Sequence, residues 1–222
     1  MIKWSYSSIK TFDQCPKKYY HLKVARDVED KAGPEAAYGV EVHKAAEDYI
    51  KEGTPIPEKF GFMRPVLEAF EKMPGTKHTE IRFGVKKTDA GYEACKFSDK
   101  DAWYRGIADL VILNGDKARV IDYKTGKSAK YADMKQLDLM AGSIFLRYPE
   151  VNRIKAALVY VVSNDFITKE YERDNVTKYL NVFSWQLDRL EAAMDSGVFN
   201  PVSGPLCGWC PVVHCEHHRP RR

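Results

Sequence analysis

The stretch GIADLVILNGDKARVIDYK, residues 106–124, contains two apolar runs that flank Asn114-Gly115. Asn-Gly between two such runs is the strongest short-range signal for a β-hairpin. Apolar side chains fall on both alternating faces of the runs, whereas a sheet with one solvated face would show them on one face only. The set comprises Ile107, Val111, Leu113 and Val120 on one face and Leu110, Ile112 and Ile121 on the other. The sequence therefore predicts two central strands of a sheet that is covered on both sides.

The charged side chains of interest within these apolar runs are Asp109, Asp122 and Lys124. With a two-residue loop at Asn114-Gly115, Asp109 faces Val120, and the two aspartates become diagonal neighbours on one face. With a four-residue loop the aspartates lie directly opposite each other, and in both registers the lysine joins them by strand alternation. A three-residue loop would turn the second aspartate to the other face. We therefore expect two carboxylates and an amine on one face for an even loop length.

Charged groups at the end of a central hairpin are costly to bury unless they pair or bind an ion. Hard oxygen ligands suit Mg²⁺ or Mn²⁺, which keep coordination positions for water and a phosphate oxygen. A lysine beside such an ion can orient or help to deprotonate the attacking water and balance negative charge in the transition state. The alternative is a structural Asp–Lys ion pair with a second aspartate at a strand end. Because three such groups share one face, we expect a catalytic metal site.

The order of the predicted elements indicates a mixed α/β fold, with helices first, then a central sheet, more helix and a cysteine-rich C-terminal cap. No repeat or linker marks a second domain, so we expect one domain over residues 1–222. The predicted elements are a short helix capped by Ser7 or Ser8, helices at 34–53 and 64–73, strands within 79–87, 92–98, 103–113 and 118–124, a helix within 130–148, a buried strand at 154–163, an edge strand at 167–173 and one long helix within 175–197.

Composition bounds the class of protein. A chain of 222 residues can bury a sizeable core, and 44% hydrophobic with 30% charged residues excludes wholesale disorder. No run of about 18 apolar residues appears, so we expect no membrane span. The N-terminal sequence MIKWSYSSIK lacks an apolar secretory segment, which indicates an intracellular, cytoplasmic protein. A net charge of +4 is compatible with nucleic-acid binding but is equally typical of many enzymes.

Three cysteines lie within nine residues near the C-terminus, in CGWCPVVHC, residues 207–215. In a reducing compartment, clustered cysteines favour a metal site over disulfides, and an odd total of five agrees with this. Three thiolates leave a four-ligand site incomplete, and both Zn²⁺ and a 4Fe–4S cluster accept cysteine ligands. His214, His217 or His218 could complete a zinc site. Cys95 lies in a predicted strand, and we expect no ligand role for it.

Several short motifs follow one another along the chain: SYSSIKTFDQCPKKYY, GVEVH, GIAD, DYK, a helical glutamine and CGWCPVVHC. In this order they resemble the motifs of the PD-(D/E)xK nuclease superfamily, most closely the RecB-like exonucleases. These include the nuclease domains of RecB and AddB and the CRISPR-associated four-cysteine exonucleases. The sequence departs from their pattern at Met140, which stands where the Q-x-x-x-Y element has tyrosine. Asp122 stands where many members have glutamate.

The resemblance implies a restriction-endonuclease-like core and a metal site on matching positions. Its ligands would be His43, Asp109, Asp122 and the backbone carbonyl of Tyr123. A histidine ligand shifts the preference towards Mn²⁺ relative to an all-oxygen site. Without the resemblance, a single histidine on an amphipathic helix is more often structural or exposed. Glu80 opens the first predicted strand near this set and is not assigned to it.

The resemblance also assigns the remaining roles. Lys124 would be the catalytic lysine, and Gln136 would hydrogen-bond the nucleophilic water or the DNA backbone, unless it is simply a polar residue at a helix surface. Cys15 would complete the metal site of the C-terminal cysteines. The resemblance favours a 4Fe–4S cluster over Zn²⁺ as the group held by Cys15, Cys207, Cys210 and Cys215.

Together these expectations describe a Mg²⁺- or Mn²⁺-dependent DNA exonuclease with a structural iron–sulfur cluster. Its partner would be DNA with a free end, and further partners would be a second copy of the chain or a recombination or helicase protein. Two alternatives are a non-catalytic nucleic-acid-binding module and an endonuclease with the same active site. The sequence does not determine cleavage polarity, strand preference or a pathway such as phage recombination, CRISPR adaptation or repair.

Overall fold

The structure is a computed structural model that describes residues 2–31 and 33–219. The chain forms two compact units. The terminal unit combines the N-terminal segment up to Gly33 with the C-terminal segment from Phe183, and the sheet unit comprises Pro34–Val182. The single domain expected over the whole chain stays a prediction.

Within the described residues, six strands form one sheet in the order β2-β1-β3-β4-β5-β6. Strands β4 and β5 run parallel, and the other neighbouring pairs run antiparallel. The mixed α/β fold is therefore confirmed, and so is the position of β6 at an edge. The strands are β1 (Thr76–Thr88), β2 (Gly91–Cys95), β3 (Tyr104–Asn114), β4 (Lys117–Lys124), β5 (Arg153–Tyr160) and β6 (Asp165–Glu172).

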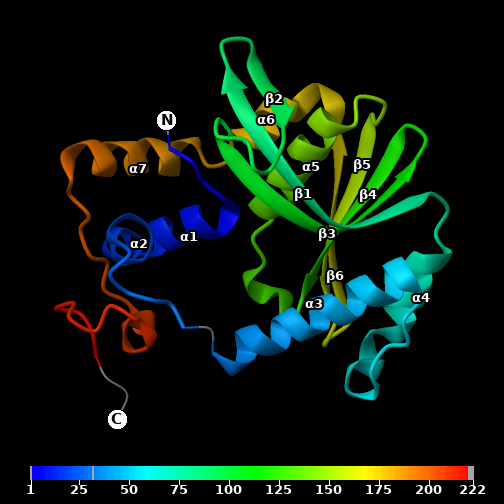
Figure 1. Cartoon of the computed structure of the whole chain (residues 1–222), viewed down its shortest axis with the longest axis horizontal. Helices are drawn as coiled ribbons and strands as arrows, with labels where there is room; N and C mark the ends of the chain where they lie inside the picture. The colour runs from blue at the N-terminus through cyan, green and yellow to red at the C-terminus, as the bar shows by residue number, and fades with distance from the viewer. Residues whose placement is uncertain (1, 32, 220–222) are drawn as a thin grey trace. The chain divides into compact units, whose positions relative to one another are not determined.

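Helices cover both faces of this sheet. Helix α3 (Pro34–Glu52), the 3₁₀ segment η2 (Glu58–Met63) and α4 (Arg64–Lys72) lie on one side, and α5 (Lys135–Arg147) lies on the other (Figure 1). Parallel neighbouring strands need a crossover connection, and α5 with the short η3 (Ala129–Tyr131) provides it between β4 and β5. Apolar side chains of α3, η2 and α4 pack against β3, β4 and β5, as expected for strands buried on both faces.

The hairpin of β3 and β4 differs from the expected two-residue loop at Asn114-Gly115. Asn114 pairs with Lys117 across the strands, so the turn residues are Gly115 and Asp116. Gly115 has φ of +60°, a conformation that glycine adopts without the penalty of a Cβ atom. Of the two registers that the sequence left open, the one with Asp109 opposite Val120 is wrong, and the one with Asp109 opposite Asp122 is observed. A four-residue loop over residues 114–117 would give this same register, because it has the same centre as the observed turn.

The long helix predicted within 175–197 is interrupted. The structure contains η4 (Arg173–Asn175), α6 (Val176–Leu180) and α7 (Ser184–Ser196), with the break at 181–183. Leu180 is fully buried and belongs to the sheet unit, where α6 packs on α5. Phe183 is also buried but packs in the terminal unit against the rings of Trp4 and Tyr6. The helix ends where the chain passes from one hydrophobic core to the other.

The terminal unit contains α1 (Tyr6–Gln14), α2 (Pro16–Tyr19), the π-helical η1 (Tyr20–Ala25), α7 and the 3₁₀ segment η5 (Pro205–Trp209). The N-cap of α1 is Ser5, not the expected Ser7 or Ser8. Ser5 Oγ accepts a hydrogen bond from the Ser8 amide, and Ser8 Oγ accepts one from the Ser5 amide. This reciprocal capping box satisfies two amides at once, which a later start would not.

None of the described helices is both long enough and apolar enough to cross a membrane.

Candidate functional site

The two predicted aspartates meet where the pairing of β3 with β4 ends, with Asp109 at the middle of β3 and Asp122 near the end of β4. Continuing the observed register beyond Leu110 and Ile121 places Asp109 opposite Asp122. Both side chains are nearly buried, with 9% and 5% of their surface exposed. The Tyr123 amide donates a hydrogen bond of 2.6 Å to Asp109 Oδ2, which joins the two strands at this point. The expected pair of carboxylates on central strands is thus present.

Asp109 belongs to a compact group of possible metal ligands with His43 and Glu80. One ligand atom from each of the three residues lies within 4.8 Å of the other two. His43, on α3, has its Nδ1 atom 3.3 Å from Asp109 Oδ1. The group opens into a hollow of about 630 Å³ lined by α3, β1 and β3. A ligand that enters this hollow would meet one imidazole and two carboxylates.

Sequence reasoning left Glu80 outside the site. Thr79 pairs with Leu110 and Ile81 with Ala108, so Glu80 and Asp109 lie in an interruption of the β1–β3 ladder. Glu80 has φ of +50°, a left-handed conformation that costs about 1–3 kcal/mol for a residue other than glycine. A single non-glycine residue with this backbone gives no signal in the sequence. The sequence feature that could have identified Glu80 is its position on β1, because β1 pairs with β3, the strand that carries Asp109.

Asp122 is held by a second set of contacts. Lys124 Nζ lies 2.5 Å from Asp122 Oδ2, and Gln136 Nε2 donates a 2.7 Å hydrogen bond to Asp122 Oδ1. Lys124 Nζ also donates to Gln136 Oε1 at 2.8 Å, which closes a triangle of three side chains. Although close to the amine, the buried Oδ2 atom accepts no well-aligned hydrogen bond from the described residues. The structure does not place Asp122 in the 4.8 Å group of His43, Glu80 and Asp109.

The electrostatics of the site indicate a shortage of positive charge. Burial and the charge of Asp109 raise the pKa of Asp122 to about 6, despite Lys124. Burial and the same charge also raise the pKa of Glu80. Burial disfavours protonation of His43, but its hydrogen bond to Asp109 and the surrounding carboxylates raise its pKa. Carboxylates that raise one another's pKa in this way are stabilised by a bound cation.

The donor set fits a divalent ion. Carboxylate oxygens suit Mg²⁺ and Mn²⁺, and an imidazole nitrogen shifts the preference towards Mn²⁺. The unsatisfied Oδ2 atom of Asp122 is a further oxygen with coordinating capacity. The Tyr123 peptide adjoins Asp109 through its amide, while ligation by its carbonyl stays a prediction.

The predicted cysteine site lies in the terminal unit. A cavity of about 220 Å³ is lined by all four predicted ligands, Cys15, Cys207, Cys210 and Cys215. All five cysteines of the chain are free thiols in the structure. Cys95 belongs to β2 in the sheet unit and does not line this cavity. The four thiols are thus grouped around one space although Cys15 is far from the others in the sequence.

Two sulfur atoms of this cavity accept backbone hydrogen bonds. The Val202 amide lies 3.4 Å from Cys15 Sγ, and the Gly204 amide lies 3.3 Å from Cys207 Sγ. Such donors stabilise negative charge on sulfur, as metal-bound thiolates require. His217 and His218 also line the cavity, whereas His214 does not and instead contacts His21.

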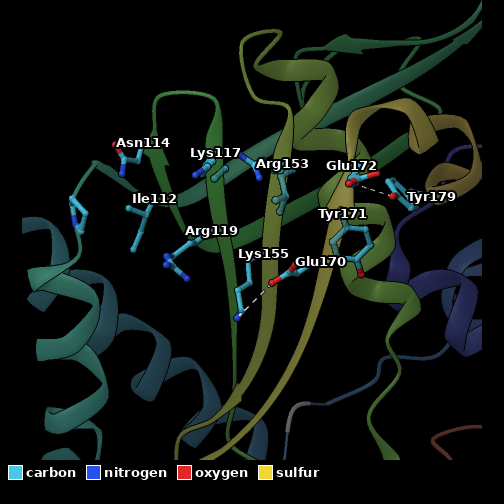
Figure 2. A pocket seen from close by; sticks show the side chains of 13 residues that line it. Ile112, Asn114, Lys117, Arg119, Arg153, Lys155, Glu170, Tyr171, Glu172 and Tyr179 are labelled. Atoms are coloured by element: carbon cyan, nitrogen blue, oxygen red, sulfur yellow. Dashed lines mark hydrogen bonds and ion pairs between the residues drawn. The ribbon is translucent and has the colours of Figure 1, made fainter.

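A separate hollow of about 450 Å³ lies over the first halves of β4 and β5 and reaches β6. Figure 2 shows cations of β4 and β5 along it, and Lys155 Nζ lies 3.8 Å from Glu170 Oε1. In the cross-strand register, Lys117 is opposite Arg153, and Arg119 is opposite Lys155. Sequence reasoning did not identify this surface. It lies towards the turn end of β4, whereas Asp122 and Lys124 lie at the other end of the strand.

Comparisons with known proteins place the chain among nucleases. The family model described as "PD-(D/E)XK nuclease superfamily" matches residues 3–215. No curated protein matches. Among solved structures, the crystal structure of SSO0001 is 15% identical with a TM-score of 0.48, covering 98% of this chain and 88% of that one. A Eubacterium rectale protein named "Putative exonuclease" is 11% identical with a TM-score of 0.49, covering 99% and 89% respectively.

Proposed function

Since this chain belongs to the PD-(D/E)XK nuclease superfamily, we propose that it is a RecB-like, Mg²⁺- or Mn²⁺-dependent DNA exonuclease with a structural 4Fe–4S cluster. Membership of the superfamily makes the protein a metal-dependent nuclease that acts on nucleic acid. What we propose beyond this membership is a preference for DNA ends, Mg²⁺ or Mn²⁺ as the metal, and a 4Fe–4S cluster at the cysteines. Partners beyond the substrate, such as a second copy or a recombination or helicase protein, and a cytoplasmic location stay expectations.

The observation that carries the proposal is the convergence of two side-chain sets where the β3–β4 ladder ends. His43, Glu80 and Asp109 would hold the divalent ion, with Asp122 as a further ligand on the facing strand. When bound, that ion would lower the pKa of a water molecule and polarise a phosphate oxygen. Because Asp109 is fixed by the Tyr123 amide, its second oxygen is aimed at His43.

Lys124 would act on the reacting groups directly, and Gln136 would hold the lysine in place. The amine of Lys124 is held between Asp122 and Gln136, so its charge has a fixed position beside the carboxylates. There it would stabilise negative charge that develops on the phosphate and orient the attacking water. The amide nitrogen of Gln136 donates to Asp122, and its amide oxygen accepts from Lys124. We therefore propose that Gln136 positions the lysine, while its expected hydrogen bond to the nucleophilic water or the DNA backbone stays a prediction.

The cluster is supported by the space between the cysteines. Tetrahedral Zn²⁺ with Zn–S bonds of about 2.3 Å brings thiolates to about 3.8 Å from one another. Among the described residues, no three cysteine sulfurs lie within 4.8 Å of one another, and all four line a common cavity. A cluster of four iron atoms holds its four thiolates further apart than one ion does. The spacing of the thiols is compatible with the larger group, which the family resemblance favours.

The test is a cleavage assay on linear DNA labelled separately at each end. Anaerobically purified protein would be assayed with Mg²⁺ or Mn²⁺, with Asp122→Ala beside it, and iron and acid-labile sulfide would be counted in the same preparation. We expect label to be released first from one end, by the unaltered protein with metal only, and about four iron atoms per chain.

Other outcomes would contradict the proposal in specific ways. Cleavage of closed circular DNA at the rate of linear DNA would replace the exonuclease with an endonuclease. Binding without cleavage of any single strand, duplex or circle would favour a nucleic-acid-binding module. A colourless preparation with one zinc and no iron per chain would exclude the cluster but not the nuclease.

A further inference from the structure

We propose that His21 and His214 form a second transition-metal site in the terminal unit, which takes one Zn²⁺ or another late first-row divalent ion. The site is separate from the cysteine cavity and from the nuclease centre. It is independent of the proposed nuclease activity, because neither histidine belongs to the sheet unit.

The separation of the two imidazoles is that of ligands on one metal ion. His21 Nε2 and His214 Nε2 lie 3.4 Å apart, with ring centroids at 4.6 Å and ring planes at 82°. Zn–N bonds of about 2.0–2.1 Å at a tetrahedral angle separate two nitrogens by about 3.4 Å. Hydrogen bonds of nitrogen donors are usually about 2.7–3.2 Å long, so 3.4 Å is long for a direct N–H···N bond.

A carboxylate fixes the orientation of the first histidine. His21 Nδ1 lies 2.9 Å and 3.2 Å from the two carboxylate oxygens of Asp27, and the His21 side chain is nearly buried. A carboxylate at Nδ1 favours the tautomer with its proton there, which leaves the lone pair of Nε2 directed at His214. Metal-bound histidines almost always donate their other ring N–H to such a group. The outer partner of a metal ligand is thus already in place.

The chemistry of the pair selects the kind of ion. Two neutral imidazoles bind Zn²⁺, Cu²⁺ or Ni²⁺ far better than Mg²⁺ or Mn²⁺, so the ions of the nuclease centre would not compete. The remaining coordination positions would hold water. The cysteine cavity is lined by His217 and His218 and by neither His21 nor His214. The second ion would therefore bind without displacing a cysteine ligand.

Such an ion would join segments that are 193 residues apart in the sequence. His21 lies in η1, and His214 precedes Cys215, so the ion would tie η1 to the C-terminal segment. Lys17, in the neighbouring helix α2, already makes a 2.6 Å ion pair with Glu216 of the C-terminal segment. Because the ion binds only when both histidines are folded together, Zn²⁺ should stabilise the folded terminal unit.

The experiment is a Zn²⁺ titration of the cluster-loaded protein under anaerobic conditions. All samples carry the substitutions His43→Gln and Asp109→Asn, which remove two possible zinc ligands from the nuclease centre. The iron content is measured before and after the titration. We expect one Zn²⁺ per chain in this parent, with an increase in Tm on Zn²⁺ addition. His21→Gln and His214→Gln should each abolish both effects. Asp27→Asn should weaken binding about 10–100-fold.

The control is His78→Gln, which removes a histidine from β1 of the sheet unit and should bind as the parent does. His214 is exposed, so His214→Gln should fold even if His21→Gln does not. A parent with full iron that binds no Zn²⁺ would overturn the proposal and leave the pair as a hydrogen bond only. Undiminished binding in His214→Gln would overturn it as well, by placing the ion elsewhere.

Discussion

Single residues where the β3–β4 ladder ends have closely defined partners. Asp122 accepts from Gln136 through one oxygen and faces Lys124 through the other. Glu80 adopts a left-handed backbone in the interruption of the β1–β3 ladder, and its carboxylate approaches Asp109. Both features are costly in a protein without a bound cation, because carboxylates repel each other in a buried environment. A cation bound between the carboxylates would offset this cost.

Replacement of Asp122 by asparagine should abolish cleavage while DNA binding and folding persist. The amide keeps the shape of the side chain but loses its negative charge, so we expect the rate to fall at least about 100-fold. The measurement is the single-turnover rate at saturating Mn²⁺. Asp116→Asn is the control, since Asp116 is an exposed turn residue of the same hairpin. Wild-type cleavage by Asp122→Asn would refute the site.

Replacement of Glu80 by glutamine should weaken metal binding more than it slows catalysis. Because Glu80 supplies one of three converging ligand atoms, we expect the Mn²⁺ concentration for half-maximal rate to rise about tenfold or more. The measurement is the rate as a function of Mn²⁺ concentration. Glu47→Gln is matched to it, since Glu47 lines the same hollow but pairs with Lys44. An identical Mn²⁺ dependence in Glu80→Gln and wild type would remove Glu80 from the ligand set.

At the scale of elements, the crossover helix α5 contributes a side chain to the candidate site. Its residue Gln136 reaches the carboxylate on β4, and two positions later Asp138 is anchored to β6. Lys169 Nζ donates to Asp138 Oδ1 at 2.6 Å, and the Tyr171 hydroxyl donates to the same atom at 2.8 Å. This buried anchor fixes the start of α5, and with it the position of Gln136.

Loss of this anchor should therefore cost stability. Asp138→Ala leaves the buried Tyr171 hydroxyl without its acceptor, and we expect a loss of about 1–3 kcal/mol in the free energy of unfolding. Tyr171→Phe removes one hydrogen bond and leaves Lys169 in place, so about 1 kcal/mol is expected. Urea unfolding measures both. A larger loss in Tyr171→Phe than in Asp138→Ala would show that the anchor is not centred on the carboxylate.

At the scale of the whole molecule, the chain is organised as two compact units of which one contains both ends. Cys15 lies in the N-terminal segment, and Cys207, Cys210 and Cys215 lie in the C-terminal segment of the same unit. A shared metal group would close a loop of almost the full chain. By a polymer estimate borrowed from disulfides, one cross-link of this length stabilises the folded state by about 5 kcal/mol.

Cys15→Ser should consequently lose the cluster and expose the terminal unit. We expect loss of iron and sulfide, and faster proteolysis within residues 2–31 and 183–219 than within 34–182. Absorbance, iron analysis and limited proteolysis with mass spectrometry measure this. Cys95→Ser is the matched control, because Cys95 lies in the sheet unit away from the cavity. Full iron content in Cys15→Ser would assign the fourth ligand to another residue, such as His217 or His218.

The sequence by itself determined the elements and the identity of the chemical groups. Alternation in GIADLVILNGDKARVIDYK predicted the central strands, and the two aspartates and the lysine were found on them because side-chain direction follows local periodicity. Cysteine spacing predicted a metal site near the C-terminus, and the family resemblance added Cys15, His43 and Gln136.

Tertiary structure decided what depends on contacts between distant segments. The turn at Gly115-Asp116 set the register that opposes Asp109 and Asp122, a choice that local pattern left open. The interruption at Glu80 brought a further carboxylate to the candidate site, and the pairing of His21 with His214 joined the N-terminal and C-terminal segments. The helix expected over 175–197 broke because Leu180 and Phe183 are buried in different cores. Local periodicity fixes the direction of each side chain along its own segment, whereas the packing of separate segments fixes which side chains meet.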